Sequence, residues 1–219
     1  MTQLSQSEEN YLKTIFHIYS DTGIDVATNE IAENLSTSPA SVSDMLKKLS
    51  IKKLVHYEKY KGVTLTEIGN TLATKIVRKH RLWEVFLVQK LHFSWDEVHE
   101  IAEELEHIQS SLLIQRLDDY LGNPTHDPHG DPIPNEFGQF NHKVKTILTD
   151  FDIQKDAVVM GVKDTDSKLL KYLDKVGITL GTKIKILEIM EFDSSMEIEI
   201  NENQKLFLSK EISKNIFVN

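Results

Sequence analysis

A short acidic stretch carries metal-binding side chain types at the spacing of helical turns. His99, Glu103 and His107 follow one another at intervals of four residues, and Glu106 lies beside them. In one continuous helix these groups share a face and resemble half of an octahedral oxygen and nitrogen site. Carboxylates held so closely repel one another unless a cation binds between them. The pattern favours a divalent-cation site whose occupancy changes the stability of the protein.

An earlier pair has the same character, because His80 and Glu84 are also four residues apart. Such a pair alone is usually a surface ion pair, and an acidic helix is usually just hydrated, so this plainer reading stays open beside the metal site. The zinc-protease pattern His-Glu-x-x-His is not matched, since Glu103 stands where its second histidine would be.

The composition restricts the chemistry further. The chain has no cysteine, which excludes disulfides, catalytic thiolates and zinc–thiolate sites. The remaining ligand types leave Mn²⁺, Fe²⁺ and other divalent transition metals open. We find no glycine-rich phosphate loop and no nucleophile paired with a base, and we expect no enzyme and no small organic cofactor. The polar N-terminus and the lack of a long apolar run predict a cytoplasmic protein without membrane contact.

Charge is distributed unevenly along the chain. The formal net charge is −9, yet residues 45–61 contain six lysines and one glutamate. Residues 95–107 contain six acidic side chains and no lysine or arginine. A local basic segment is sufficient to attract nucleic acid even when the whole protein is acidic.

Helical periodicity dominates the chain as far as residue 120. Ser38 followed by Pro39 is a strong helix start, since serine caps the helix and proline fits its first turn. Two β-type runs, 54–60 and 63–65, meet at Lys61-Gly62 and predict a hairpin. Four further helices are predicted. The first ends near Asp21–Gly23 and the second is capped by Thr28. The third opens at Thr66, and the fourth runs from about Ser94 through Leu117.

A short helix, a turn, a capped helix and a hairpin in this order predict a winged helix-turn-helix that binds double-stranded DNA. Small side chains at the start of the capped helix suit approach to base edges, and lysines suit phosphates. The alternative is a generic three-helix core with a hydrated lysine surface. The predicted DNA contacts are Ser38, Pro39, Ala40, Ser41, Ser43 and Asp44, then Lys47 and Lys48, with Lys59 and Lys61 on the wing.

Four of the five prolines lie between residues 124 and 134, which indicates a boundary loop. After residue 150 short strand-like runs alternate with turns, at 157–159, 183–189 and 197–200. Only Ser167–Lys175 has a helical pattern there, so we predict a small β-barrel-like domain.

The chain resembles the diphtheria-toxin-repressor and manganese-transport-regulator family of metalloregulators over essentially its whole length. The resemblance lies in SEENYLKTIF, STSPASVSDMLKKL, RKHRLWEVFL, VHEIAEELEH and HGDPIP, which occur in this order. It implies a mostly α protein with a small β part. The implied domains are a winged helix-turn-helix at 1–72, a helical metal-binding and dimerisation domain at 73–140, and an SH3-like domain similar to the iron-transport accessory protein FeoA at 151–219.

The resemblance also implies two metal sites. Asn10 stands where family members have Met or Asp, so its neutral amide weakens that ligand, and Glu9 is an alternative. Iron-selective members have Cys where this chain has Glu103, which favours Mn²⁺, while Asn10 keeps Fe²⁺ open. The primary site implied is Asn10, His80, Glu103, Glu106 and His107. The ancillary site would draw on Glu84, His99, Asp127 and His129, with an acidic residue from Asp164 or Asp166.

The family further implies a homodimer that represses metal-homeostasis genes from a near-palindromic operator, with Trp83, Phe86 and Leu112–Leu113 in the dimer interface. Metal would join the first helix to the long helices. Two alternatives remain. A metal-buffering or metal-dependent hydrolytic protein would bind metal without changing its DNA affinity. A regulator that responds to a small molecule would tolerate replacement of Glu103 and Glu106.

Overall fold

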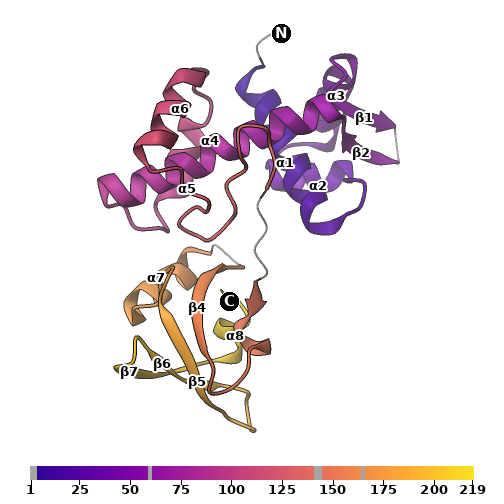
Figure 1. The fold of residues 1–219 in the computed structure, drawn as a ribbon. Helices are drawn as coiled ribbons and strands as arrows, with labels where there is room; N and C mark the ends of the chain where they lie inside the picture. The colour runs from indigo at the N-terminus through magenta and orange to yellow at the C-terminus, as the bar shows by residue number, and fades with distance from the viewer. Residues whose placement is uncertain (1–3, 59–60, 141–144, 164–165) are drawn as a thin grey trace. The chain divides into compact units, whose positions relative to one another are not determined.

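The computed structural model describes residues 4–58, 61–140, 145–163 and 166–219. The chain forms two compact units, each built from several segments of the sequence. Figure 1 traces the chain through both. The first unit comprises Met1–His80, Glu103–Ile114 and Pro134–Phe140, and the second comprises Arg81–Ala102, Gln115–Ile133 and Asn141–Asn219.

The first unit opens with three helices and a β-hairpin, which confirms the predicted winged helix-turn-helix (Figure 1). The two strands are antiparallel, with Val55 opposite Leu65 and Glu58 opposite Gly62. The elements are α1 (Gln6–Thr22), α2 (Thr28–Asn34), α3 (Pro39–Ile51), β1 (Val55–Glu58) and β2 (Gly62–Leu65).

Apolar side chains from the three helices form the core of this unit. Leu12 and Ile15 of α1, Ile31 of α2 and Leu46 of α3 are all fully buried in one cluster. Burial of side chains of this size stabilises a fold by about 1.5–3 kcal/mol each. This packing joins α1, α2 and α3 in one core and leaves the opposite face of α1 for polar contacts.

Local caps determine where these helices start and end. Ser5 and Glu8 form a capping box at the start of α1, and Gly23 ends the helix at a left-handed φ of 67°. Ser38 accepts a hydrogen bond from the backbone N–H of Ser41 at 3.1 Å, as predicted for the start of α3. The predicted cap at Thr28 is wrong, because Thr28 is the first residue within α2 and Ala27, without a side-chain cap, precedes it.

The helical region continues with α4 (Glu67–Leu91), α5 (Val98–Leu105) and α6 (Ser111–Tyr120). The single helix predicted from Ser94 through Leu117 is therefore wrong. The chain leaves helical geometry after Leu105 and starts again at Ser110, whose hydroxyl accepts from the N–H of Leu113 at 3.2 Å. As a result His107 lies beyond the end of α5 and is not in line with His99 and Glu103, contrary to the prediction.

The C-terminal part of the second unit is a six-stranded antiparallel sheet in the order β3-β8-β4-β5-β6-β7. The predicted strands and the helix near Ser167 are confirmed, but α8 was not expected. The elements are β3 (Thr146–Ile147), a 3₁₀ turn (Leu148–Asp150), β4 (Asp156–Val162), α7 (Ser167–Val176), β5 (Lys183–Ile189), β6 (Met196–Ile200), β7 (Gln204–Leu208), α8 (Lys210–Ser213) and β8 (Ile216–Val218).

One apolar core joins this sheet to the helical segments of the second unit. Trp95 is buried in the same cluster as Leu170, Leu173 and Ile186, and its indole N–H donates to the carbonyl of Leu170 at 3.2 Å. Among the described residues, no helix has the length and apolar character needed to cross a membrane.

Candidate metal centre and nucleic-acid interface

The polar face of α1 meets the segment that follows α5, within the first unit. Oε2 of Glu9, on α1, lies 2.6 Å from Nδ1 of His107. A carboxylate only accepts hydrogen bonds, so Nδ1 carries the proton. The other oxygen of Glu9 accepts from Nε2 of Gln109 at 2.8 Å. Glu9 thus fixes the ring of His107 and leaves its Nε2 as the lone-pair nitrogen.

Nε2 of His107 lies 3.9 Å from Oε1 of Glu106, whose side chain is fully buried. This Oε1 of Glu106 is buried and has no hydrogen-bond partner among the described residues, and the same is true of Oδ1 of Asn10 on α1. A buried acceptor without a partner is costly. A cation would satisfy such an acceptor, and Oε1 of Glu106 beside Nε2 of His107 therefore fits a bound metal ion.

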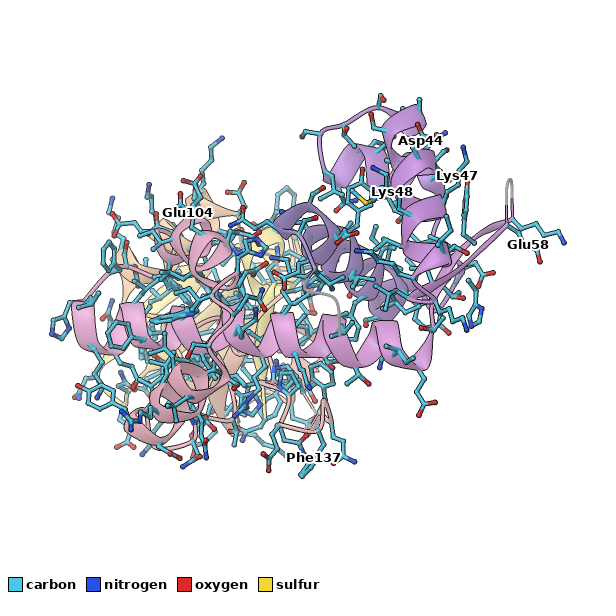
Figure 2. All side chains as sticks on the ribbon, turned by 90° about the horizontal axis from the view of Figure 1, so that it is seen from above. Asp44, Lys47, Lys48, Glu58, Glu104 and Phe137 are labelled. Carbon is cyan, nitrogen blue, oxygen red and sulfur yellow. The ribbon has the colours of Figure 1, made fainter. Side chains whose placement is uncertain are left out.

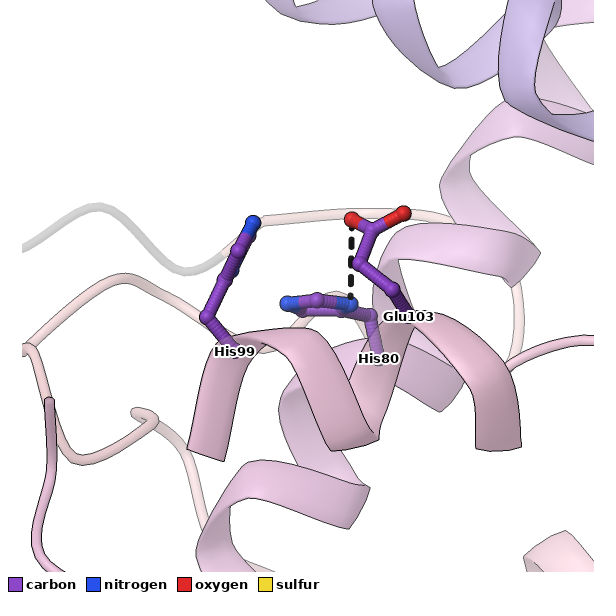
Figure 3. Close-up of side chains that lie close together, drawn as sticks. All are labelled: His80, His99 and Glu103. Atoms are coloured by element: carbon purple, nitrogen blue, oxygen red, sulfur yellow. Dashed lines mark ion pairs between the residues drawn. The ribbon is translucent and has the colours of Figure 1, made fainter. Parts of the chain in front are cut away.

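His80 and Glu103 adjoin the same carboxylate. Nδ1 of His80 lies 2.7 Å from Oε2 of Glu106 and 3.7 Å from Oε1 of Glu103; Figure 3 shows the second pair as a dashed line. Because the carboxylate accepts, Nδ1 of His80 donates to Glu106 and orients it. Four of the five predicted primary residues are therefore connected by direct contacts, and Asn10 is next to Glu9 on α1.

Lys13 occupies this cluster and was missed by the sequence analysis. Its ammonium lies 2.7 Å from Oε1 and 2.8 Å from Oε2 of Glu106, and it also pairs with Glu103. The available signal was its position on α1, since Lys13 follows Glu9 by four residues and Asn10 by three and so shares their face.

A second cluster lies within the second unit. One ligand atom from each of Glu84, Asp127 and His129 lies within 4.8 Å of the others, and all three residues are buried. Nε2 of His129 contacts the backbone carbonyl of Trp95 at 2.8 Å and must therefore donate to it. That bond turns Nδ1 of His129 towards Oε2 of Glu84, 3.8 Å away.

Burial and charge perturb the pKa values of this cluster. Burial raises the pKa of Asp127 to about 7, helped by the charge of Glu84. Burial alone would lower the pKa of His129, but Glu84 and Asp127 outweigh it and raise that pKa to about 9. The raised pKa of His129 thus reflects the negative charge that Glu84 and Asp127 concentrate in this cluster.

Two backbone segments meet closely beside His129, at Gly130 and Gly161. The carbonyl of His129 accepts from the N–H of Val162 at 2.9 Å. Gly130 has a φ of +89°, and a Cβ there would lie 2.0 Å from the carbonyl oxygen of Met160. Only glycine fits this crossing.

The other predicted ancillary residues have different positions. His99 is largely exposed, with Nδ1 3.6 Å from Oε1 of Glu84, so it lies at the edge of the cluster. Asp166 caps α7 by accepting from the N–H of Lys168 at 2.8 Å. Asp164 lies outside the described residues.

The predicted DNA-contacting residues that the structure describes lie at the start and on the surface of α3 and at the hairpin. Figure 2 shows Asp44, Lys47 and Lys48 on α3 and Glu58 near the hairpin end. Lys47 pairs with Asp44 at 3.0 Å, which raises the pKa of Lys47 through that hydrogen bond. Lys61 is exposed and pairs with Glu58 at 2.6 Å. Lys59 is outside the described residues.

The start of α3 presents small side chains. Ser38, Pro39, Ala40 and Ser41 are all exposed. Ser43 is half-buried, and its hydroxyl donates to the carbonyl of Pro39 at 2.9 Å. Its hydroxyl proton is therefore used within the helix, whereas the first turn is open to a ligand.

Three family models match the chain. The model described as the N-terminal DNA binding domain of iron dependent repressors matches residues 3–63. The metal binding and dimerisation domain of the same repressors matches residues 66–135. The FeoA domain matches residues 147–219.

Individual relatives agree with these matches. A solved manganese-dependent transcriptional repressor in complex with manganese is 34% identical, with a TM-score of 0.81 over 96% of this chain and 98% of that one. The iron-dependent repressor IdeR of Mycobacterium tuberculosis is 37% identical over 134 residues, which are 61% of this chain and only 58% of IdeR. The diphtheria toxin repressor of Corynebacterium diphtheriae is 29% identical over 193 residues, 87% of this chain and 75% of that relative.

Proposed function

Because the chain belongs to the diphtheria-toxin-repressor and manganese-transport-regulator family, we propose that it is a DNA-binding transcriptional repressor activated by a divalent metal ion. The observation that carries this proposal is the double role of α1. One face of α1 packs into the winged-helix core through Leu12 and Ile15. The other face carries Glu9 and Asn10 into the candidate metal centre.

A direct ion pair extends this connection to the recognition helix. Oε1 of Glu8, on α1, lies 2.6 Å from Nζ of Lys52. Lys52 is the C-terminal cap residue of α3. A shift of α1 would therefore move α3 through both the apolar core and this ion pair, which couples occupancy of the metal centre to DNA affinity.

The donor set supports Mn²⁺, with Fe²⁺ as the alternative. Glu103, Glu106, Asn10 and Nε2 of His107 offer carboxylate, amide and imidazole ligands, which suit borderline to hard cations. The bound ion supplies the positive charge that these acceptors share. His80 and Glu9 would orient Glu106 and His107. We propose Glu84, Asp127 and His129 as the ancillary site, with His99 at its edge.

We further propose that two copies bind a near-palindromic operator. Leu112, Leu113 and Tyr120 of α6 are exposed large apolar side chains, as an interface between copies requires. Trp83 is already buried in a single subunit. In a dimer, the two α3 helices would bind DNA half-sites about 34–36 Å apart. The domain division 1–72, 73–140 and 151–219 belongs to this proposal.

The test is DNA affinity measured with and without metal. Fluorescence anisotropy on DNA from upstream of the chain's own gene should show tighter binding when Mn²⁺ is added. Glu103→Gln should remove this response, whereas Glu104→Gln should retain it, because Glu104 is an exposed neighbour on the same helix (Figure 2). Equal DNA affinity in Mn²⁺ and in chelator would refute the proposal and favour a metal-buffering or hydrolytic protein.

A further inference from the structure

Lys13 is held in the candidate metal centre in a way that a surface lysine is not. Its side chain is only 9% exposed, and that of Glu106 is fully buried. Its ammonium contacts both carboxylate oxygens of Glu106 and one of Glu103. An ammonium has three donors, and two of them are used in hydrogen bonds to Oε2 of Glu106 and to Glu103. Oε1 of Glu106 lies within ion-pair distance but accepts no hydrogen bond from a described residue.

The contacts matter most at Glu106, because its side chain is closed to water. Buried carboxylates that lose their counter-charge are strongly destabilising. Lys13 is therefore a cation that offsets the negative charges of Glu103 and Glu106. Lys79, another lysine near the cluster, is half-buried, and burial lowers its pKa despite the charges of Glu9 and Glu106.

A metal ion at Glu106 would lie close to the ammonium of Lys13. Oε1 of Glu106 lies 2.7 Å from the ammonium of Lys13 and is also the oxygen that faces Nε2 of His107. A metal ion bound to that oxygen would be in direct charge repulsion with the ammonium. This repulsion favours release of the lysine from Glu106 when metal enters.

We propose that Lys13 is a tethered cation that competes with the divalent metal for Glu103 and Glu106 and so sets the affinity of the centre. The inference rests on the proposed metal site. Lys13 stabilises the metal-free form, weakens metal binding, and becomes accessible to solvent when the metal binds. Lys13 thus raises the metal concentration at which the protein switches.

The experiment is isothermal titration with Mn²⁺ together with thermal unfolding of the metal-free protein. Lys13→Met should raise Mn²⁺ affinity by at least about tenfold and should lower the melting temperature of the metal-free protein. Lys13→Arg keeps the charge and should bind Mn²⁺ close to wild type. Lys171→Met is the matched control, since Lys171 pairs with the buried Asp96 at 3.2 Å in the second unit, and its Mn²⁺ affinity should not change.

Two outcomes separate this inference from the metal site itself. If Glu106→Gln lowers Mn²⁺ affinity but Lys13→Met leaves it equal or lower, Lys13 is only structural and the inference is overturned. If Glu106→Gln binds Mn²⁺ with the same affinity as wild type, the proposed metal site itself is refuted.

Wild-type protein gives an independent readout if Lys13→Met does not fold. Modification of Lys13 by an amine-reactive reagent, followed by mass spectrometry, should increase on addition of Mn²⁺, with Lys171 as the internal reference. Reactivity of Lys13 that is unchanged by saturating Mn²⁺ overturns the inference.

Discussion

Replacing Glu9 by glutamine tests how the structure orients His107. Glu9 is 5% exposed and accepts two hydrogen bonds, from Nδ1 of His107 at 2.6 Å and from Nε2 of Gln109 at 2.8 Å. Glutamine has the same shape but one acceptor oxygen for these two donors. The variant must lose one bond and the negative charge that strengthens both.

The expected magnitude follows from the bond that is lost. A charge-assisted hydrogen bond contributes about 1.5–3 kcal/mol, and about 1.4 kcal/mol corresponds to a tenfold change in affinity. Groups that orient a metal-binding histidine typically change metal affinity by about 10–100-fold. Because one bond survives in Glu9→Gln, we expect a loss of about tenfold in Mn²⁺ affinity, measured by isothermal titration.

Glu8→Gln is the matched control for this prediction. Glu8 is the preceding residue on α1 and is also buried, but it pairs with Lys52 instead of His107. It should lose stability without a change in Mn²⁺ affinity. Equal Mn²⁺ affinity in Glu9→Gln and wild type, with both folded, would refute the assigned role of Glu9.

Three further predictions concern the second cluster, the glycine crossing and the DNA interface. The pKa of His129 is raised to about 9 from 6.5. In chelator, the stability that this residue contributes should therefore be complete below pH 6.5 and be lost as the pH rises through 9. Urea unfolding should show this loss of stability, and His129→Gln should reduce the loss. Gly130→Ala should destabilise far more than Gly122→Ala in thermal unfolding, because a Cβ at Gly130 meets the Met160 carbonyl whereas one at Gly122 meets nothing within 4 Å. Lys48→Ala should weaken binding to all DNA sequences alike and reduce the salt dependence of binding by about one charge; a loss confined to the operator would contradict a phosphate contact.

The sequence predicts local structure where one signal is enough. Ser38 and Pro39 specify the start of α3 through a side-chain cap and a fixed φ, and Gly62 permits the hairpin turn. The break between α5 and α6 is a different case. Apolar spacing continues across it, so periodicity alone extends the helix, while the cap at Ser110 that starts α6 is a weaker signal.

The candidate site was predictable in its residue types but not in its contacts. Spacing and family resemblance predict Glu103, Glu106 and His107 as metal ligands. They do not show that Glu9 holds His107, since those residues are 98 positions apart. The ammonium of Lys13 is likewise 93 positions from Glu106. Contacts of this range depend on how α1 packs, which no local pattern encodes.

The central claim is that metal and DNA binding are coupled through α1, and coupling is reciprocal. Mn²⁺ affinity should therefore be measured by titration with and without saturating operator DNA. The account predicts that DNA raises Mn²⁺ affinity by the same factor by which Mn²⁺ raises DNA affinity, a factor of roughly 5–150. Mn²⁺ affinity that is identical in the presence and absence of DNA would contradict it.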